Sequence, residues 1–130
     1  MDKPVLSIVI PTREEEKVIG ATIAHMRSLK TPHEIIVSDG RSLDRTVEVA
    51  RALADQVVVY DGAQKHTAAR GRNDGARIAK SDFLVFIDAE THIPDPNAFF
   101  RRALAHFDDP RVAGVAGPQR ARPEIATWAD

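Results

Sequence analysis

Short apolar runs along the chain alternate with longer stretches in which apolar residues recur every three or four positions. The apolar runs have the length and the β-branched character of strands. They occupy residues 5–11, 33–40, 56–62, 82–88 and, more weakly, 111–117. The stretches with the helical period occupy residues 14–29, 44–54, 67–80 and 95–107. This alternation predicts an α/β fold with a mostly parallel sheet, right-handed crossovers and helices on both faces.

Two of the helical stretches contain residues that interrupt their pattern. In the first, Thr22 is a polar interruption on a face otherwise formed by apolar residues such as Ile19 and Ile23. In the third, Gly71 and Gly75 lower the helix propensity, but the surrounding alanines and arginines still favour a helix.

Length and composition predict a single domain over residues 1–130. A chain of 130 residues with 43% hydrophobic content can bury one core. Its formal net charge of -1 gives no general attraction to nucleic acid, so no nucleic-acid partner is expected. The absence of cysteine excludes disulfides, thiolate zinc sites and cysteine nucleophiles.

The first residues of the chain bear on its location. They carry no basic leader, and their apolar run is too short for a signal peptide or a membrane span. We therefore expect a cytoplasmic protein, with a peripheral position at the inner face of the membrane as the alternative.

Acidic residues follow several of the predicted strands. Ligands of open parallel sheets bind outside the carboxyl ends of the strands, which makes these acids candidates for chemistry. Asp61, which precedes Gly62, and Asp44 are explained by ordinary turn and helix-cap preferences. Asp88 and Glu90, which end the fourth apolar run, are not explained so simply.

Asp88 and Glu90 are two residues apart on an extended backbone, so their side chains point to the same side. Their Cα atoms should lie roughly 6.5–7 Å apart, and the two carboxylates repel unless a cation or a basic group neutralises them. Hard oxygen ligands of this kind suit Mg²⁺ or Mn²⁺, with substrate phosphates completing the shell. The alternative is a solvated acidic loop, because acids after strands are common.

Four stretches of the chain resemble a known family. They read "LSIVIPTREEEKVIGATIAHM", "EIIVSDGRSLDRTVEVA", "AARGRNDGARIAKSDFLVFIDAET" and "HIPDP". In this order and spacing they resemble the nucleotide-sugar-binding part of glycosyltransferase family 2, the inverting enzymes with a GT-A fold. The resemblance implies a Rossmann-like sheet. It also implies that the C-terminal half, which shapes the acceptor site and supplies the general base, lies outside these 130 residues.

The resemblance also implies roles for particular residues. The first strand end lines the base and ribose pocket of the family, and here it contains Pro11, Thr12, Arg13 and Glu15. Glu15 matches the acid that contacts the ribose. Arg13 stands where the family often has tyrosine, which leaves the choice of base open. Asp39 matches the acid that accepts a hydrogen bond from the nucleobase.

Further residues match the part of the family's site that holds the diphosphate. Arg70 and Arg72 fall in the segment that runs past the phosphates, and arginine offers paired donors to phosphate oxygens. Asp88 and Glu90 take the place of the Asp-x-Asp metal motif and imply a Mn²⁺ or Mg²⁺ cofactor. His92 is a further candidate ligand, although a lone histidine in a polar loop is more often solvated.

The implied function is transfer of a sugar from a UDP- or GDP-sugar to an acceptor hydroxyl, with inversion and metal assistance. No catalytic base is assigned, and the acceptor is open between saccharide, lipid and protein. One alternative is a binding module or a split subunit whose acceptor site comes from a partner chain or from a second copy. Another is a nucleotidyltransferase, which would be expected to carry a glycine-rich basic loop where this chain has "PTREEE". No G-x-G-x-x-G follows any strand, which disfavours a dinucleotide oxidoreductase.

Overall fold

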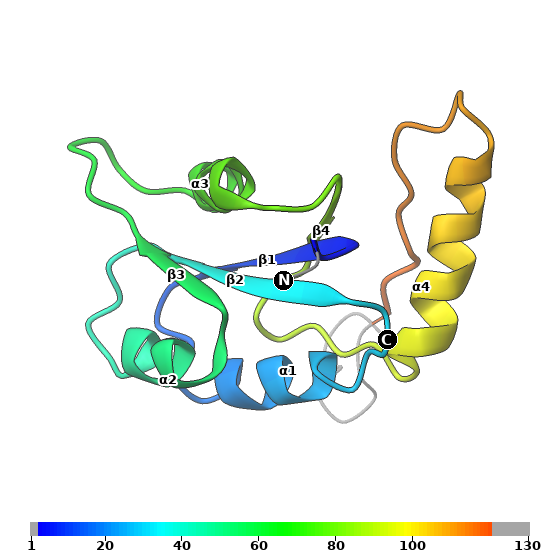
Figure 1. The fold of residues 1–130 in the computed structure, drawn as a ribbon. Coiled ribbons are helices and arrows are strands. Elements are labelled where there is room, and N and C mark those ends of the chain that lie inside the picture. The colour runs from blue at the N-terminus through cyan, green and yellow to red at the C-terminus, as the bar shows by residue number, and fades with distance from the viewer. Residues whose placement is uncertain (1–2, 121–130) are drawn as a thin grey trace. The chain divides into compact units, whose positions relative to one another are not determined.

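The structure, a computed structural model, describes residues 3–120 (Figure 1). Strands alternate with helices as the sequence predicts. The elements are β1 (Leu6–Thr12), α1 (Ile19–Met26), β2 (His33–Asp39), α2 (Thr46–Leu53), β3 (Gln56–Val59), α3 (Ala68–Ile78), β4 (Phe83–Phe86), α4 (Pro96–Ala105) and the 3-10 helix η1 (His106–Asp108). The chain divides into two compact units, the first ending at Asn97 and the second beginning at Ala98.

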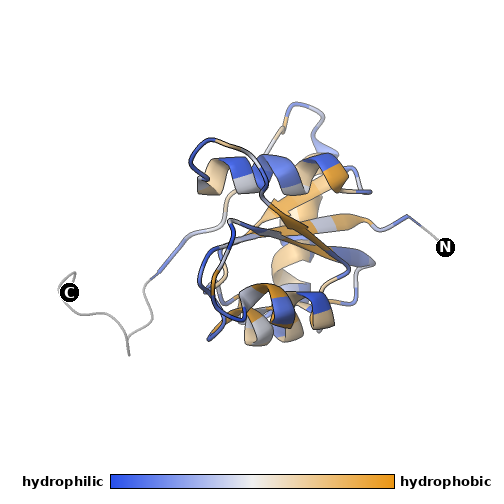
Figure 2. Cartoon of the chain, turned by 90° about the vertical axis from the view of Figure 1, so that its left-hand side faces the viewer, coloured by the Kyte–Doolittle hydropathy of each residue, from blue (hydrophilic) through white to orange (hydrophobic). Residues whose placement is uncertain are grey.

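The first unit is built on a four-stranded sheet in the order β3-β2-β1-β4, with every pair parallel. The two central strands are apolar on both faces, as expected for strands covered on both sides. Ile8 of β1 pairs with Ile35 of β2, and both are fully buried. Figure 1 shows α1 and α2 on one face and α3 on the other, and Figure 2 shows the apolar strands between these helical layers. The predicted fold class is therefore confirmed.

The two glycines of α3 explain how that helix lies so close to the sheet. Gly71 and Gly75 are the buried residues of α3. A Cβ atom built on Gly75 would collide with the side chain of Val9 in β1. The low helix propensity of glycine is therefore offset by close helix-to-sheet packing.

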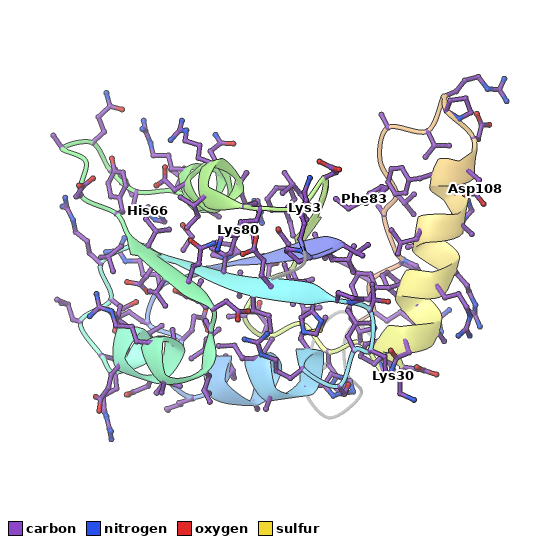
Figure 3. All side chains as sticks on the ribbon, viewed as in Figure 1. Lys3, Lys30, His66, Lys80, Phe83 and Asp108 are labelled. Atoms are coloured by element: carbon purple, nitrogen blue, oxygen red, sulfur yellow. The ribbon has the colours of Figure 1, made fainter. Side chains whose placement is uncertain are left out.

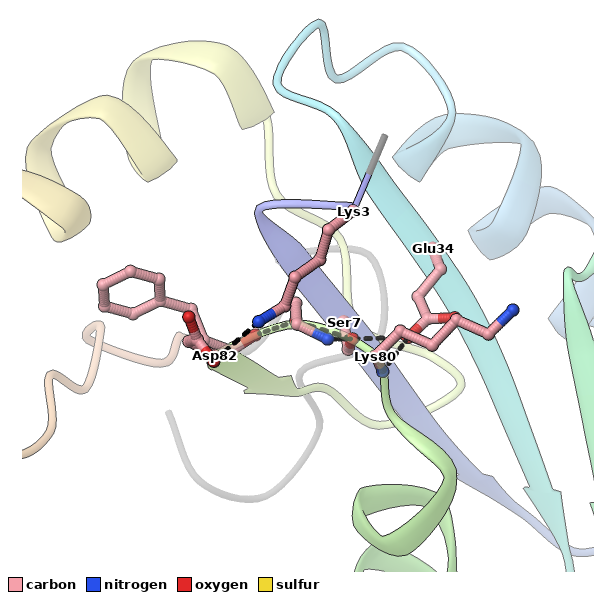
Figure 4. Close-up of polar contacts among 7 residues, drawn as sticks. Lys3, Ser7, Glu34, Lys80 and Asp82 are labelled. Atoms are coloured by element: carbon pink, nitrogen blue, oxygen red, sulfur yellow. Dashed lines mark hydrogen bonds and ion pairs between the residues drawn. The ribbon is translucent and has the colours of Figure 1, made fainter. Parts of the chain in front are cut away.

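A buried carboxylate ties the amino-terminal edge of the sheet to the end of α3 (Figure 4). Glu34 accepts hydrogen bonds from the Ser7 hydroxyl and from the backbone N–H of Lys80, each at 2.6 Å. Gln56 donates a third bond at 3.0 Å. Each carboxylate oxygen thus has a partner, which burial of a charged group requires.

Three sequence predictions about element boundaries are wrong, and one of them is the third strand, which ends at Val59 rather than near residue 62. The first helix begins at Ile19 rather than near residue 14, because Glu14 has a left-handed φ of 53° and the backbone N–H groups of residues 14–16 bond to side chains of the loop at 42–46. The fourth strand ends at Phe86, and it is an edge strand in the described sheet. Leu84 and Phe86 are therefore 43% and 46% exposed, rather than buried as their apolar run suggests.

The second unit contains most of α4 and η1. The rings of Phe99 and Phe100 meet edge to face, with centroids 5.1 Å apart. The predicted fifth strand at residues 111–117 is wrong, because this segment forms no strand within the described chain. Its glycines and alanines offer little side-chain surface to bury, and Val115 is 42% exposed.

We predict that Gly75→Ala destabilises the protein, although alanine is the better helix former. The added methyl group would collide with Val9, and overpacking of this kind costs about 1–3 kcal/mol. Gly20→Ala in α1 is the matched control, since its nearest contact would be Val49 at 3.3 Å. Urea denaturation of both variants measures the difference. A Gly75→Ala variant as stable as the wild type would contradict the close packing of α3.

Candidate active site

A pocket of about 250 Å³ lies at the carboxyl ends of β1 and β4. It is lined by Pro11, Thr12, Arg13, Glu15, His66, Thr67, Ala68, Asp88, Ala89 and Glu90. In the strand order β3-β2-β1-β4, the chain proceeds from β1 to β2 and β3 on one side and later returns to β4 on the other. The crevice between β1 and β4 is therefore a topological switch point, where parallel sheets bind their ligands.

Most of the residues predicted from the first and fourth strand ends meet in this pocket. They are Pro11, Thr12, Arg13, Glu15, Asp88 and Glu90. The pairing of β1 with β4 brings them together, although more than 70 residues separate them in the chain. Asp39, Arg70 and Arg72 are not among the lining residues.

Asp39 lies behind the pocket wall and supports it. Its side chain is fully buried. The carboxylate accepts hydrogen bonds from the Thr12 hydroxyl and from both the N–H and the hydroxyl of Ser42, each at 2.7 Å. Asp39 therefore fixes Thr12 and the loop after β2 in this conformation. The predicted contact with a nucleobase gains no support from this geometry and stays a prediction.

Glu15 faces the other acids of the site. Burial raises the pKa of its carboxyl above the ordinary value of 4.5, and the nearby charges of Glu90, Asp44 and Asp88 raise it further. Its backbone N–H bonds to the Thr46 hydroxyl at 2.8 Å. Burial is therefore the main cause of the raised pKa, and the negative charges of Glu90, Asp44 and Asp88 add to it.

Arg72 supplies the basic partner that this negative potential requires. It reaches from α3 to Asp88, with 3.2 Å between Nη2 and Oδ1. The two side chains are 38% and 51% exposed, and ion pairs of such exposure contribute about 1 kcal/mol or less. A ligand can therefore separate the pair at little cost, leaving a carboxylate for a cation and a guanidinium for a phosphate.

Arg70 does not line the pocket. It is exposed, and its guanidinium donates to the side-chain oxygen of Gln64. The predicted contact of Arg70 with phosphate therefore stays a prediction without support from this conformation.

The start of α3, which the sequence predicts as a helix from residue 67, belongs to the site, although Thr67 and Ala68 were not named as site residues. Thr67 is the N-cap, and its hydroxyl accepts from the backbone N–H of Arg70 at 3.2 Å. Thr67 and Ala68 line the pocket. The first N–H groups of a helix and its dipole favour anions. A threonine before an alanine-rich helix is a recognisable N-cap signal, so this feature could have been found.

His66 also lines the pocket, and no sequence signal indicated it. It lies in the connection from β3 to α3 (Figure 3), with its ring centroid 5.0 Å from that of Tyr60. Gly40 and Gly71 leave room for the imidazole, since a Cβ on either residue would press against it. Its Nε2 atom is buried and has no hydrogen-bond partner within residues 3–120.

The donor set fits a hard divalent cation that also binds the substrate. Asp88 and Glu90 present two carboxylates to one pocket. Among the described residues, no three acids or histidines are placed to hold a metal by themselves, so phosphates would supply the remaining oxygens. His92 is outside the lining, and its ring stacks on His25 with centroids 4.5 Å apart. The suggestion that His92 is a ligand is therefore not supported.

The family model described as glycosyl transferase family 2 matches residues 7–127, which is nearly the whole chain. The chain belongs to this family. The family 2 chain is 33% identical to a validoxylamine A glucosyltransferase of Streptomyces hygroscopicus subsp. limoneus, covering 94% of this chain and 29% of that relative. No helix between residues 3 and 120 combines the length and the apolar character that a membrane span requires.

Solved structures agree with the family assignment. A mannosyltransferase from Pyrobaculum calidifontis, solved with GDP-Man and Mn²⁺, superposes with a TM-score of 0.71 at 22% identity, over 86% of this chain and 34% of that one. A glucosyl-3-phosphoglycerate synthase from Mycobacterium tuberculosis, solved with Mn²⁺, UDP and its product, gives a TM-score of 0.60 at 28% identity, over 85% and 40%. The fold is thus the GT-A glycosyltransferase fold. The family 2 chain spans about a third of the length of these proteins.

We predict that neutralising Glu15 stabilises the protein, whereas neutralising Glu48 does not. The folded protein holds the Glu15 proton more tightly than the unfolded chain, so ionised Glu15 destabilises it as pH rises through 4.5 and then through the raised pKa. Glu15→Gln should therefore stabilise the protein at about pH 7 by about 0.3–1 kcal/mol.

The control is Glu48→Gln. The hydrogen bond and the charge of Arg45 hold the pKa of Glu48 below 4.5, so its ionised form is favoured and its loss brings no gain. Thermal melts at about pH 7 and about pH 3.5 measure both variants. The gain from Glu15→Gln should disappear at the lower pH, and a Glu15→Gln variant less stable than the wild type at pH 7 would contradict the raised pKa of Glu15.

Proposed function

We propose that this chain is the nucleotide-sugar-binding part of an inverting, metal-assisted glycosyltransferase. The donor is a UDP- or GDP-sugar, and the acceptor is a hydroxyl group. The observation that carries the proposal is one pocket that is lined both by two carboxylates from the end of β4 and by the start of α3. Such a pocket offers oxygen ligands for a cation on one side and donors for phosphate oxygens on the other.

The pyrophosphate of the donor fits between these two groups. Thr67 and Ala68 bring the N-terminal end of α3 to the pocket. Arg72, released from Asp88, can donate to a phosphate oxygen. Asp88 and Glu90 would hold Mn²⁺ or Mg²⁺ against the phosphates. The mycobacterial synthase shares the fold at 28% identity and was crystallised with Mn²⁺ and UDP, which supports a divalent cation together with a nucleotide.

The nucleoside fits along the end of β1. Pro11, Thr12, Arg13 and Glu15 form that wall, and Thr12 is held in place by Asp39. Glu15 belongs to this wall, and its carboxylate is suited to accept a hydrogen bond from a ribose hydroxyl.

In the reaction, the acceptor oxygen attacks the anomeric carbon on the face opposite the diphosphate. The bond from that carbon to the phosphate oxygen breaks, and the configuration inverts. Asp88 and Glu90 would hold a divalent cation, which would neutralise charge on the departing diphosphate. Arg72 is placed to stabilise the same charge. The general base that takes the acceptor proton is assigned to the C-terminal half of the whole protein, as the family resemblance implies.

The same pocket would also serve a module that binds the nucleotide sugar without transferring it, with the acceptor site on a partner chain. The pocket residues assigned above account for binding of the donor, and none of them is assigned to the acceptor. Family membership makes a nucleotidyltransferase the weaker alternative. A cytoplasmic location, or one at the inner face of the membrane, belongs to the proposal as well.

We predict that the chain binds a UDP- or GDP-sugar more tightly in the presence of Mn²⁺, and that Asp88→Asn removes this dependence. Loss of the charged ligand should weaken binding with Mn²⁺ by about tenfold or more, or about 1.4 kcal/mol. Calorimetric titration with each donor, with and without Mn²⁺, measures the effect.

Asp82→Asn is the matched control. Asp82 is an exposed aspartate that pairs with Lys3, and it lies just before β4, at the end of that strand away from the pocket. A wild-type chain that binds neither donor would overturn the donor site. An Asp88→Asn variant with full Mn²⁺ dependence would overturn the metal role. Incubation with donor and candidate acceptors then separates the enzyme from the binding module, which would leave the donor intact.

A further inference from the structure

Two polar residues of α1 hold the loop that carries the candidate metal ligands. We call residues 87–93 the acid loop. The Thr22 hydroxyl donates to the carbonyl oxygen of Ala89 at 2.5 Å. One turn later on the same helix, His25 Nε2 lies 2.6 Å from the carbonyl oxygen of Ile93. A carbonyl oxygen only accepts, so this nitrogen of His25 carries the proton.

Thr22 is a polar residue on a buried, apolar face of α1, and its hydrogen bond to Ala89 accounts for this position. Its neighbours on the face, Ile19, Ile23 and Met26, are 0–1% exposed. Threonine in a helix commonly bonds its hydroxyl to a carbonyl of the preceding turn. Here the hydroxyl crosses instead to a residue 67 positions away in the chain. The polar interruption seen in the sequence is therefore a connection to the site.

The acid loop needs such a connection because the sheet no longer supports it. β4 ends at Phe86, and the hydrogen bond from Ile87 N–H to the Val9 carbonyl, at 3.2 Å, follows directly after the strand. Beyond that point the backbone leaves the ladder with β1. A turn closes the loop locally, with the N–H of Thr91 bonded to the carbonyl of Asp88 at 3.0 Å.

Ala89 is the fixed point between the two acids. It is 1% exposed, whereas Asp88 and Glu90 on either side are exposed. Holding the Ala89 carbonyl against α1 therefore turns both carboxylates outward, toward the pocket that they line. A change at Thr22 acts on two metal ligands at once without touching either of them.

His25 adds a second point of attachment. Besides its bond to Ile93, its ring stacks on that of His92, with an interplanar angle of 26°. We call Thr22 and His25 the two anchors. They lie three residues apart on α1 and bond to the acid loop at Ala89 and at Ile93.

We propose that Thr22, assisted by His25, is a positioning residue that sets the geometry of Asp88 and Glu90 for cation binding. The proposal rests on the proposed function, since it takes these acids to be the metal ligands. Neither anchor contacts the donor pocket. Partners that orient metal ligands typically change metal affinity by about 10–100-fold when they are removed.

The test compares Thr22→Val, which removes the hydroxyl and keeps the shape, with Thr22→Ser, which keeps the hydroxyl. Thr22→Val should weaken Mn²⁺-dependent binding of UDP or GDP by about tenfold. Thr22→Ser should retain most of the wild-type affinity. In the absence of metal, amide hydrogen exchange of the acid loop should be faster in Thr22→Val than in the wild type.

Ser7→Ala is the control for general destabilisation. Ser7 is fully buried, and its hydroxyl donates to Glu34 near the amino-terminal ends of β1 and β2, away from the pocket. This variant should lose stability while the exchange of the acid loop and the Mn²⁺ dependence stay as in the wild type.

The outcomes separate the two proposals. A wild type that binds no nucleotide overturns the proposed function, and the exchange measurement still tests the anchor. A folded Thr22→Val variant with wild-type exchange and affinity overturns the anchor. If Thr22→Val fails to fold, His25→Ala decides the question, because His25 is only partly buried. Faster exchange at the acid loop then supports the proposal, and unchanged exchange overturns it.

Discussion

The parallel pairing of β1 with β4 is the constraint on which the site depends. The two strands run together from Leu6 and Phe83 to Val9 and Phe86. β4 stops there, whereas β1 continues for three more residues beside β2. The crevice opens where one partner ends and the other goes on. Any arrangement that moved β4 to another position in the sheet would separate Asp88 and Glu90 from the wall at Thr12.

Electrostatics gives this crevice its chemical character. Three carboxylates, those of Glu15, Asp88 and Glu90, line one small pocket, where burial and then the neighbouring negative charges raise the pKa of Glu15. Arg72 and the first turn of α3 supply the positive charge and the N–H donors near these carboxylates. A pocket that is lined by acids and lies beside groups suited to bind anions fits a ligand that carries both signs of charge, as a metal-bound diphosphate does.

Close packing and buried hydrogen bonds hold these groups in position. The glycines of α3 let the helix approach β1, and Glu34 fastens the far end of the same helix to the sheet. Asp39 holds Thr12, and Thr22 holds Ala89. Asp88 and Glu90 are therefore exposed, while Asp39 and Thr22, which hold neighbouring parts of the site, are buried. This division is typical of a site built on a rigid scaffold.

Much of this arrangement could be predicted from the sequence, because it depends on local periodicity and on strand ends. The four strands, the helix over Gly71 and Gly75 and the acids after β4 all follow from patterns within one segment. Features that depend on contacts between distant segments could not be read in this way. The bond from Thr22 to Ala89, the burial of Asp39 and the place of His66 in the pocket belong to this class. The failure of the fifth strand has the same origin, since a strand exists only where a partner pairs with it.

The most direct test of the central claim is a crystal structure of the chain with Mn²⁺ and a UDP- or GDP-sugar. We predict that the pyrophosphate lies between the first turn of α3 and a cation bound by Asp88 and Glu90, with Arg72 moved from Asp88 to a phosphate oxygen. A pyrophosphate bound elsewhere, with the Arg72–Asp88 pair intact, would contradict the account.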